Sequence, residues 1–354
     1  MHKTFYTLNI KEITKETNDT VSISFDVPNE LEDTFTFLPG QHLTLKTQIN
    51  GEEIRRSYSI CSASFENNLT VAIKEIENGV FSSYANSTLK VGDQLETLEP
   101  NGNFKIETNP SNSKNYILYA AGSGITPIIS MVKTVLEAEP SSNIQLYYGN
   151  KTAADTIFKA ELDALNAAHS NFNLTYILSR EESGSTNTNG RIDAEKCASF
   201  YADNHASVNI DAVYMCGPEE MVMCVKDFYT NKGVDKSKLH FELFTTSGHT
   251  VEAPILTGEP FQSEITVIID DEEFEFALKS DGKDILQAAQ DEDADVPFSC
   301  KGGVCCTCKA KVLEGSVRMD LNFALEEDEI ADGFVLTCQA HPTSKKVVIS
   351  YDEY

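Results

Sequence analysis

The sequence predicts a multidomain protein in which an antiparallel β-barrel, an α/β unit with a parallel sheet and a compact α+β unit follow one another. Short alternating β-rich segments come first, buried strands alternating with helices come next, and a hairpin, a helix and a cysteine-rich loop come last. The 354 residues suffice for two or three domains. We expect a barrel at 1–110, the α/β unit at 111–246, a linker at 247–262 and the α+β unit at 263–354.

The N-terminal part contains short β-rich segments separated by turn dipeptides. Turns are expected at Pro39-Gly40 and Asn50-Gly51, and strands at Val21–Phe25, His42–Leu45, Tyr58–Ile60 and Leu69–Ile73. Many short antiparallel strands at this spacing are typical of a small closed barrel.

A polar string on one of these strands has candidate chemistry. Arg56-Ser57-Tyr58-Ser59 offers a guanidinium for a phosphate, a tyrosine on the same strand face for a flat ring, and a serine hydroxyl for a ring nitrogen. Taken alone, four residues on an ordinary exposed strand are the simpler interpretation.

A second candidate is the turn around Gly79, Val80 and Ser82, which precedes a helix expected at Tyr84–Leu89. A glycine followed by a serine near a helix N-terminus can bind an anion through free N–H groups. Plain helix capping is the alternative.

The central part begins with a buried strand at Tyr116–Ala120, and a glycine-rich turn joins it to a helix at Ile128–Glu139. Such a turn is where the pyrophosphate of a nucleotide binds. The turn is G-x-G-x-x-P and lacks the third glycine of the dinucleotide fingerprint; its candidate binding residues are Gly122, Gly124, Thr126 and Pro127.

Two later strands of this part end in candidate nucleotide contacts. The strand at Leu174–Leu178 runs into Ser179 and Arg180, which favour the 2′-phosphate of NADPH, although acidic residues follow and a solvated turn is the alternative. The strand at Ala212–Cys216 runs into a helix through Gly217-Pro218. Cys216 therefore either borders a nicotinamide or is inert packing.

Cysteine spacing gives the strongest signal in the chain. Cys300, Cys305, Cys308 and Cys338 form C-x4-C-x2-C followed by one remote cysteine, the spacing of a plant-type 2Fe-2S cluster. A zinc site prefers paired C-x2-C or mixed Cys and His ligands. Disulfides fit poorly, because nothing marks secretion.

The loop sequence itself supports the cluster. Gly302 and Gly303 let the backbone fold back with its N–H groups directed at the sulfurs. Cys306 falls inside the C-x2-C turn, where it is expected to be a bystander thiol and not a ligand.

Charge limits the classes of partner. Fifty-five acidic against 28 basic residues give a net charge of −27, which argues against nucleic acid or an anionic membrane. Residues 263–354 hold 21 acidic and 8 basic side chains, which suits docking to a basic redox partner or simply a soluble surface. The chain has no apolar run long enough to span a membrane, and the cytoplasm is the expected compartment.

Taken together, the three segments resemble the ferredoxin-NADP reductase superfamily fused to a C-terminal plant-type ferredoxin domain, as in reductase components of multicomponent oxygenases. The segments Leu178–Glu181, Cys300–Cys305 and Met319–Glu326 carry this resemblance to the oxygenase reductases. It implies a flavin-binding barrel, a nucleotide-binding α/β domain and a β-grasp ferredoxin domain. The implied route runs from NADPH through FAD to the cluster and then to an oxygenase or another redox protein.

The resemblance also implies roles for individual residues. Ser59, Cys216 and Glu242 are expected to position the rings and tune the flavin N5, and Phe244 to stack on the flavin. The remaining implied contacts are Arg56 with the flavin phosphates, Tyr58 with the isoalloxazine face, Gly79, Val80 and Ser82 with the flavin pyrophosphate, Gly122, Gly124, Thr126 and Pro127 with the nicotinamide nucleotide's phosphates, and Gly217 and Pro218 with the nicotinamide.

Three alternatives stay open at this point. The donor can be NADH, in a reductase that serves a Rieske-type or other oxygenase. The flavin can be FMN, because the R-x-Y-S string does not choose between FMN and FAD. The chain can also be an electron-transfer or redox-sensing module that does not turn over pyridine nucleotide.

Overall fold

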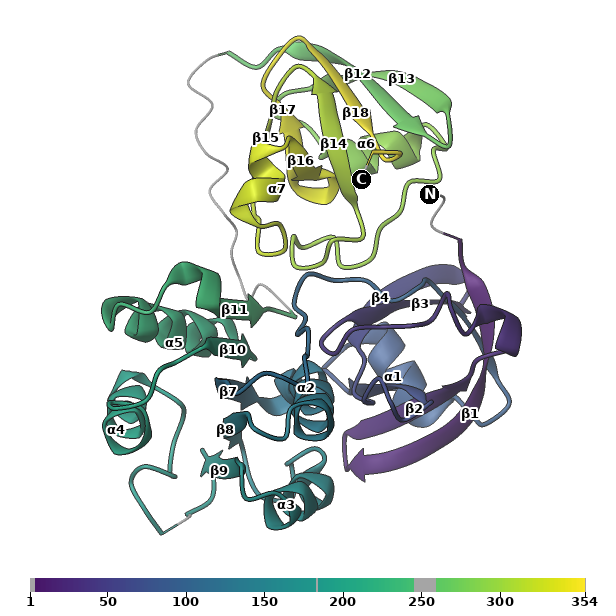
Figure 1. Cartoon of the computed structure of the whole chain (residues 1–354). Coiled ribbons are helices and arrows are strands. Elements are labelled where there is room, and N and C mark those ends of the chain that lie inside the picture. The colour runs from purple at the N-terminus through teal and green to yellow at the C-terminus, as the bar shows by residue number, and fades with distance from the viewer. Residues whose placement is uncertain (1–3, 183, 245–258, 354) are drawn as a thin grey trace.

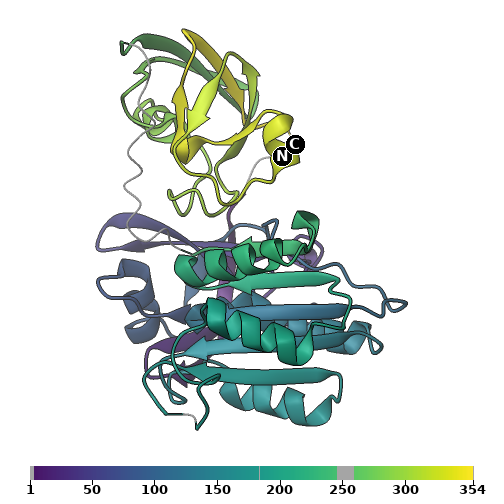
Figure 2. The same ribbon diagram turned by 90° about the vertical axis from the view of Figure 1, so that its left-hand side faces the viewer.

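The computed structural model describes residues 4–182, 184–244 and 259–353, which form three units (Figure 1). Of the expected linker at 247–262, residues 247–258 lie outside the described residues. In Figures 1 and 2 the C-terminal unit lies over the other two, and the loop before its strand β14 points toward them. None of the described helices is both long and apolar enough to cross a membrane.

The N-terminal unit is an antiparallel six-stranded sheet in the order β4-β3-β6-β1-β2-β5. A bridge between Ile60 and Val71 joins the chain after β4 to β5, so the sheet closes into the expected barrel. Its core includes Leu8, Ile23 and Leu45. The strands are β1 (Tyr6–Thr17), β2 (Thr20–Asp26), β3 (His42–Ile49), β4 (Glu52–Ser59), β5 (Leu69–Lys74) and β6 (Gln94–Thr97).

Helix α1 (Val80–Ser87) covers the barrel and begins earlier than the predicted Tyr84–Leu89. Gly79 is its N-cap, and Ser82 lies inside the first turn, where its hydroxyl donates to the Gly79 carbonyl and accepts from the Ile76 N–H. The alternative of plain serine capping is therefore wrong, because the Ser82 hydroxyl bonds the preceding loop instead. A side chain at position 79 would collide with it, since a Cβ would lie 2.3 Å from Ser82 Oγ.

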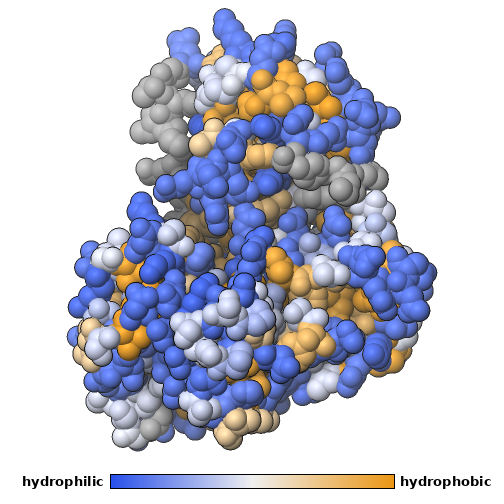
Figure 3. Space-filling view, in the orientation of Figure 1, coloured by the Kyte–Doolittle hydropathy of each residue, from blue (hydrophilic) through white to orange (hydrophobic). Residues whose placement is uncertain are grey.

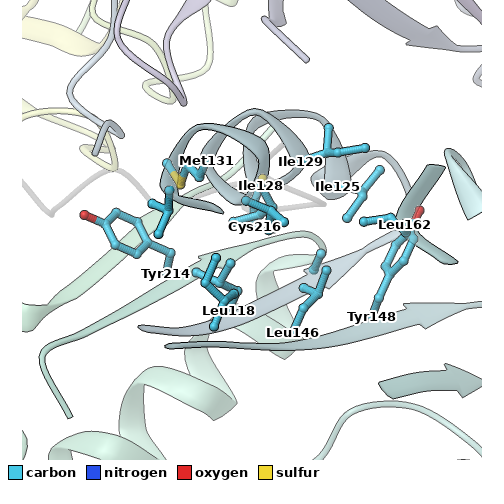
Figure 4. Packing of buried hydrophobic residues seen from close by; sticks show 14 of the residues in the cluster. Leu118, Ile125, Ile128, Ile129, Met131, Leu146, Tyr148, Leu162, Tyr214 and Cys216 are labelled. Atoms are coloured by element: carbon cyan, nitrogen blue, oxygen red, sulfur yellow. The ribbon is translucent and has the colours of Figure 1, made fainter. Parts of the chain in front are cut away.

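The central unit is a five-stranded parallel sheet in the order β11-β10-β7-β8-β9. Figure 2 shows helices on both of its faces, and Figure 4 shows Ile125, Ile128 and Ile129 of α2 packed over Leu118 and Leu146 of the sheet. The elements are β7 (Asn115–Ala121), α2 (Ile125–Ala138), β8 (Asn143–Asn150), α3 (Lys159–Ala168), β9 (Phe172–Leu178), α4 (Ala194–Asn204), β10 (Ala212–Cys216), α5 (Glu219–Asn231) and β11 (Leu239–Glu242).

This sheet has the βαβ pattern expected from the sequence. The strands are apolar on both faces because helices cover both, with α2 and α3 over one core and α4 and α5 over the other. The carboxyl ends of its strands therefore share one edge, where ligands bind in sheets of this kind.

The C-terminal unit combines a mixed five-stranded sheet, in the order β13-β12-β18-β14-β16, with a two-stranded pair, β15-β17. Helix α6 starts after its N-cap Asp284, whose carboxylate accepts from the Gln287 N–H at 2.8 Å. The elements are β12 (Gln262–Ile269), β13 (Glu272–Lys279), α6 (Ile285–Asp291), β14 (Lys309–Glu314), β15 (Val317–Met319), α7 (Glu327–Ala331), β16 (Phe334–Leu336), β17 (Ala340–Pro342) and β18 (Lys346–Ser350).

Hydrophilic side chains cover most of the face shown in Figure 3. All nine cysteines of the chain fall in the described residues, and all are free thiols.

Candidate functional site

Four cysteines meet between the loop before β14 and the turn after β16. Cys305 Sγ lies 3.2 Å from Cys300 Sγ, and the Cys338 thiol contacts both Cys300 and Cys308. Cys305, Cys308 and Cys338 are buried, whereas Cys300 is half-buried. The structure thus brings together all four expected ligands, including the remote one.

The donor set fits a 2Fe-2S cluster. Four soft thiols converge, and the Gly302 N–H points at Cys300 Sγ from 3.3 Å. Hydrogen bonds from the thiols of Cys305 and Cys338, and from the backbone N–H groups of Gly302 and Val304, hold the pKa of Cys300 well below its usual range. The thiol–thiol contacts raise the pKa of Cys305 and Cys338, so they favour the thiolate that a metal requires only at Cys300 and Cys308.

The Cys306 thiol lies against the backbone of the segment before α7. Its thiol is buried and donates to the Ala324 carbonyl at 3.3 Å, which matches the expected bystander. Within the described part of the chain, no group of three or more His, Cys, Asp or Glu side chains is arranged to hold a single metal ion. The four thiols instead contact one another in the order Cys305, Cys300, Cys338, Cys308.

The loop at residues 298–308, called the cysteine loop below, also contacts the barrel. Ser299, next to Cys300, lies with its hydroxyl 2.8 Å from that of Ser57 on β4. Thr307, next to Cys308, lies with its hydroxyl 3.5 Å from that of Thr44 on β3. The two loop residues that flank the ligands are thus held by two neighbouring strands of the barrel.

The same loop contacts the parallel-sheet unit. Val304, between Gly303 and Cys305, packs against the core that contains Leu239 and Leu243. The cysteine site therefore lies where all three units meet.

Strand β4 presents different residues on its two faces, because side chains alternate along a strand. Tyr58 packs its ring against Phe81 of α1 with centroids 5.5 Å apart, and burial raises the pKa of its hydroxyl. Arg56, on the Tyr58 side, is exposed. Ser57 faces the other way, toward Ser299. The hydroxyl of Ser57, expected to bind a cofactor, is thus directed to the cysteine loop.

The barrel also meets the edge of the parallel sheet. The Ser59 hydroxyl donates to Glu242 Oε2 at 3.3 Å, and His42 Nδ1 lies 3.9 Å from Glu242 Oε1. Glu242 pairs in register with Cys216 of the neighbouring strand β10. Three residues expected to position the rings, Ser59, Cys216 and Glu242, therefore adjoin one another, although 183 residues separate Ser59 from Glu242.

Burial controls the ionisation of this group. Loss of water raises the pKa of the Glu242 carboxyl to about 8, and the Ser59 hydrogen bond only partly opposes this rise. Burial, followed by the nearby Glu242, raises the pKa of the Cys216 thiol well above its usual value. Near neutral pH both groups are protonated more readily than their exposed counterparts, so Cys216 is not a reactive thiolate.

The glycine-rich turn after β7 lies against the end of β10. A Cβ at Gly124 would lie 2.1 Å from the Cys216 carbonyl oxygen, so only glycine allows this approach. Thr126 and Pro127 lie in the first turn of α2, and the Thr126 hydroxyl donates to the Ser123 carbonyl at 3.0 Å. Gly122, at the start of the turn, has φ +54°.

The turn after β10 lies beside it. Gly217 has φ +157°, and a Cβ there would lie 2.8 Å from Met221 Cε. Pro218 is the N-cap of α5. The two turns together form one face at the carboxyl ends of β7 and β10, as expected for a nucleotide site.

Ser179 and Arg180 are exposed beyond the end of β9. Their backbone N–H groups donate to Asn150 and Lys151, which fixes the turn and leaves the Arg180 side chain at the surface. Phe244 is 36% exposed after β11, and Val80 is 46% exposed at the start of α1. These side chains lie where a bound molecule can reach them.

Other residues of the site were not singled out from the sequence. His42, Arg55 and Phe298 gain their positions only when β3, β4 and the cysteine loop pack together. No spacing rule distinguishes these three residues from ordinary strand and loop residues. The one weak signal is that His42 begins a strand directly after the turn at Pro39-Gly40.

Family models match each unit. Residues 7–106 match an oxidoreductase FAD-binding domain, residues 118–227 an oxidoreductase NAD-binding domain, and residues 267–343 a 2Fe-2S iron-sulfur cluster binding domain. The chain belongs to the family of NAD(P)H-dependent oxidoreductases that carry FAD and a 2Fe-2S cluster and act as reductase components of multicomponent monooxygenases.

Two curated relatives extend over nearly the whole chain. One of the subunits of 1,2-phenylacetyl-CoA epoxidase from Escherichia coli (strain K12) is 39% identical over 99% of this chain and 98% of its own length. The ferredoxin reductase component of 3-ketosteroid-9-alpha-monooxygenase from Rhodococcus rhodochrous is 31% identical over 97% of this chain and 96% of its own.

Solved structures share the architecture. Phthalate dioxygenase reductase, a modular structure for electron transfer from pyridine nucleotides to [2Fe-2S], is 25% identical, covers 98% of each chain and gives a TM-score of 0.62. An intact type IV self-sufficient cytochrome P450 monooxygenase matches 98% of this chain and 41% of its own with a TM-score of 0.74; at 20% identity it shows the fold alone.

Proposed function

We propose that this chain carries electrons from NADPH through FAD to its 2Fe-2S cluster and on to the oxygenase of a phenylacetyl-CoA epoxidase. The observation that carries the proposal is strand β4, which has the expected flavin residues Arg56 and Tyr58 on one face and contacts the cysteine loop through Ser57 on the other. When bound, a flavin accepts two electrons as a hydride and releases them one at a time, which a 2Fe-2S cluster requires.

The side chains at the edge of the parallel sheet position the reacting rings. Cys216, Gly217 and Gly124 define the face on which a nicotinamide would lie, and beside it Glu242 bonds Ser59 at the end of β4. The raised pKa of Glu242 keeps a proton on its carboxyl near neutral pH, beside the hydroxyl assigned to flavin N5.

The remaining cofactor contacts follow from the turns. Gly79, Val80 and Ser82 are proposed to lie against the flavin pyrophosphate, and Phe244 to stack on the flavin. Free N–H groups at the start of α1 are the donors that a phosphate needs.

The preference for NADPH depends on Ser179 and Arg180. Both are exposed at the carboxyl end of β9, where the 2′-phosphate of a nucleotide bound at this edge would lie. A guanidinium and a hydroxyl are suitable donors for that phosphate.

The partner is inferred from the relatives and the charge. Identity of 39% to a component of phenylacetyl-CoA epoxidase supports that oxygenase as the acceptor. The 31% identity to a 3-ketosteroid-9-alpha-monooxygenase component supports one alternative, a reductase that serves another oxygenase. Net charge of −27 suits a basic acceptor surface, and nine free thiols suit the cytoplasm.

Anaerobic stopped-flow mixing of the reconstituted protein with NADPH or NADH tests the route. We expect flavin bleaching followed by cluster reduction, and faster bleaching with NADPH. Absence of bleaching with either nucleotide would rule out a reductase, and chromatography of the heat-released flavin would separate FAD from FMN.

The acceptor needs its own experiment. Electron delivery is measured with purified phenylacetyl-CoA epoxidase oxygenase and, as a control, a Rieske-type oxygenase. Turnover with only the second would replace the proposed partner.

A further inference from the structure

Arg55 lies beside Arg56 on β4 but points to the opposite face. It is only 8% exposed, and its Cζ lies 4.3 Å from the ring centroid of Phe298 in the cysteine loop. Its guanidinium also lies 2.7 Å from Glu53 and 3.6 Å from Asp295. A buried arginine of the barrel therefore joins the C-terminal unit two residues before Cys300.

Phe298 is held from both units. Besides Arg55, Lys301 of its own loop places Nζ 4.5 Å from the ring centroid. Cation–π contacts strengthen when water is excluded, and a planar guanidinium stacks on a ring better than an ammonium does. The Ser57 to Ser299 hydrogen bond lies next to this contact, since Ser57 follows Arg55 on the same face.

We infer that Arg55 is a positioning residue that, by stacking on Phe298, fixes the cysteine loop against the flavin-binding strand and so sets the rate of electron transfer from flavin to cluster. Each step moves one electron from the reduced flavin to the oxidised cluster, and no other reactant takes part. Transfer rates fall steeply with distance, so a loosened loop slows the step. The inference rests on the proposed route and adds a role for a residue outside the cofactor contacts.

The test uses the complete, cofactor-loaded protein. Arg55→Met and Phe298→Leu each remove the stack of Arg55 on Phe298 and leave an unbranched or aliphatic side chain of similar length in its place. Phe298→Tyr keeps the aromatic ring. Lys236→Met is the matched control, because Lys236 reaches the C-terminal unit through a solvent-exposed pair with Glu327 at 3.8 Å.

Stopped-flow mixing with NADPH gives the first measurement. We expect cluster reduction to slow about tenfold in Arg55→Met and Phe298→Leu, a factor that corresponds to about 1.4 kcal/mol in the activation free energy of the transfer step. Flavin bleaching should keep its rate in every variant. Phe298→Tyr and Lys236→Met should behave as the starting protein.

Hydrogen–deuterium exchange gives a measurement independent of activity. In Arg55→Met and Phe298→Leu the amides of residues 296–308 should exchange faster, whereas Lys236→Met should leave them unchanged. The double variant should slow cluster reduction by clearly less than the product of the two single effects, because both variants remove the Arg55–Phe298 stack, although Arg55→Met also removes the pair with Asp295.

The outcomes are separable. Cluster reduction and exchange that match the starting protein in both single variants would overturn the role of Arg55, as would additive slowing in the double variant. If the starting protein bleaches its flavin but never reduces its cluster, the proposed route fails instead.

Discussion

The cysteine loop and the junction between barrel and parallel sheet are built in different ways. Three of the four thiols lie within nine residues, and the loop's own backbone N–H group supports them. At the junction, Ser59 meets Glu242 across 183 residues, and Gly124 meets the carbonyl of Cys216 from another strand end. The first site depends mainly on its ligands, and the second depends on the packing of two units.

This difference implies that each region can be disabled without the other. The regions meet through β3, β4 and the core beside Val304, so damage to one should leave the chemistry of the other measurable. Four predictions test this separation.

Replacement of a cluster ligand should have the largest effect. Cys308→Ser should abolish the visible 2Fe-2S absorption and electron delivery to a protein acceptor, because a hydroxyl is a harder ligand than a thiolate. NADPH-driven reduction of ferricyanide should remain. Cys306→Ser is the control and should keep the cluster, since its thiol contacts Ala324. Loss of ferricyanide reduction in Cys308→Ser would show that the regions are not separable.

A side chain at Gly124, which contacts the Cys216 carbonyl, should disable the junction between the barrel and the parallel sheet. Gly124→Ala puts a Cβ 2.1 Å from the Cys216 carbonyl oxygen, so we expect a loss of about 1–3 kcal/mol in unfolding free energy and of nucleotide-dependent flavin bleaching. The cluster absorption should persist. Gly149→Ala is the matched control, because the nearest atom to a Cβ at position 149 would be 3.4 Å away, an ordinary contact distance. Equal urea midpoints for the two variants would contradict the contact.

Replacement of the exposed Arg180 should change only the preference between NADPH and NADH. Arg180→Ala should lower kcat/KM for NADPH about tenfold, equivalent to one charged hydrogen bond, and leave NADH unaffected. Steady-state kinetics with both nucleotides measure this, with Lys159→Ala as the control, because Lys159 pairs with Asp163 on α3. Equal kcat/KM for both nucleotides in the starting protein would refute the preference.

Glu242 should show its effect only as a pH dependence. Its pKa of about 8 in the folded chain exceeds its ordinary value of 4.5, so its contribution to stability is complete below pH 4.5 and is lost as pH rises toward 8. Glu242→Gln cannot titrate, so its stability should fall less over this window, by at most about 1.4 kcal/mol per pH unit. Urea unfolding of the starting protein and of Glu242→Gln between pH 4.5 and 9 measures the difference. If the unfolding free energies of the two proteins changed in parallel with pH, the pKa of Glu242 would not be raised.

The sequence predicts most elements because their patterns are local. The strands at Leu69–Lys74 and Ala212–Cys216 lie within a residue or two of the expected ranges. Strand β1 escapes prediction, because register shifts after Ile10 and Lys15 break its alternation. Helix α1 was placed too late, because Ser82 bonds the loop before it from inside the first turn.

By itself the sequence predicted the four thiols that the structure brings together, the order of the three units and the glycine-rich turn after β7, since each depends on spacing along the chain. Only the tertiary structure decided that Ser59 lies beside Glu242, that Ser57 faces the cysteine loop and that Arg55 stacks on Phe298. These contacts join residues hundreds of positions apart. No local pattern encodes them, because they arise from the shapes and charges of folded units that pack together.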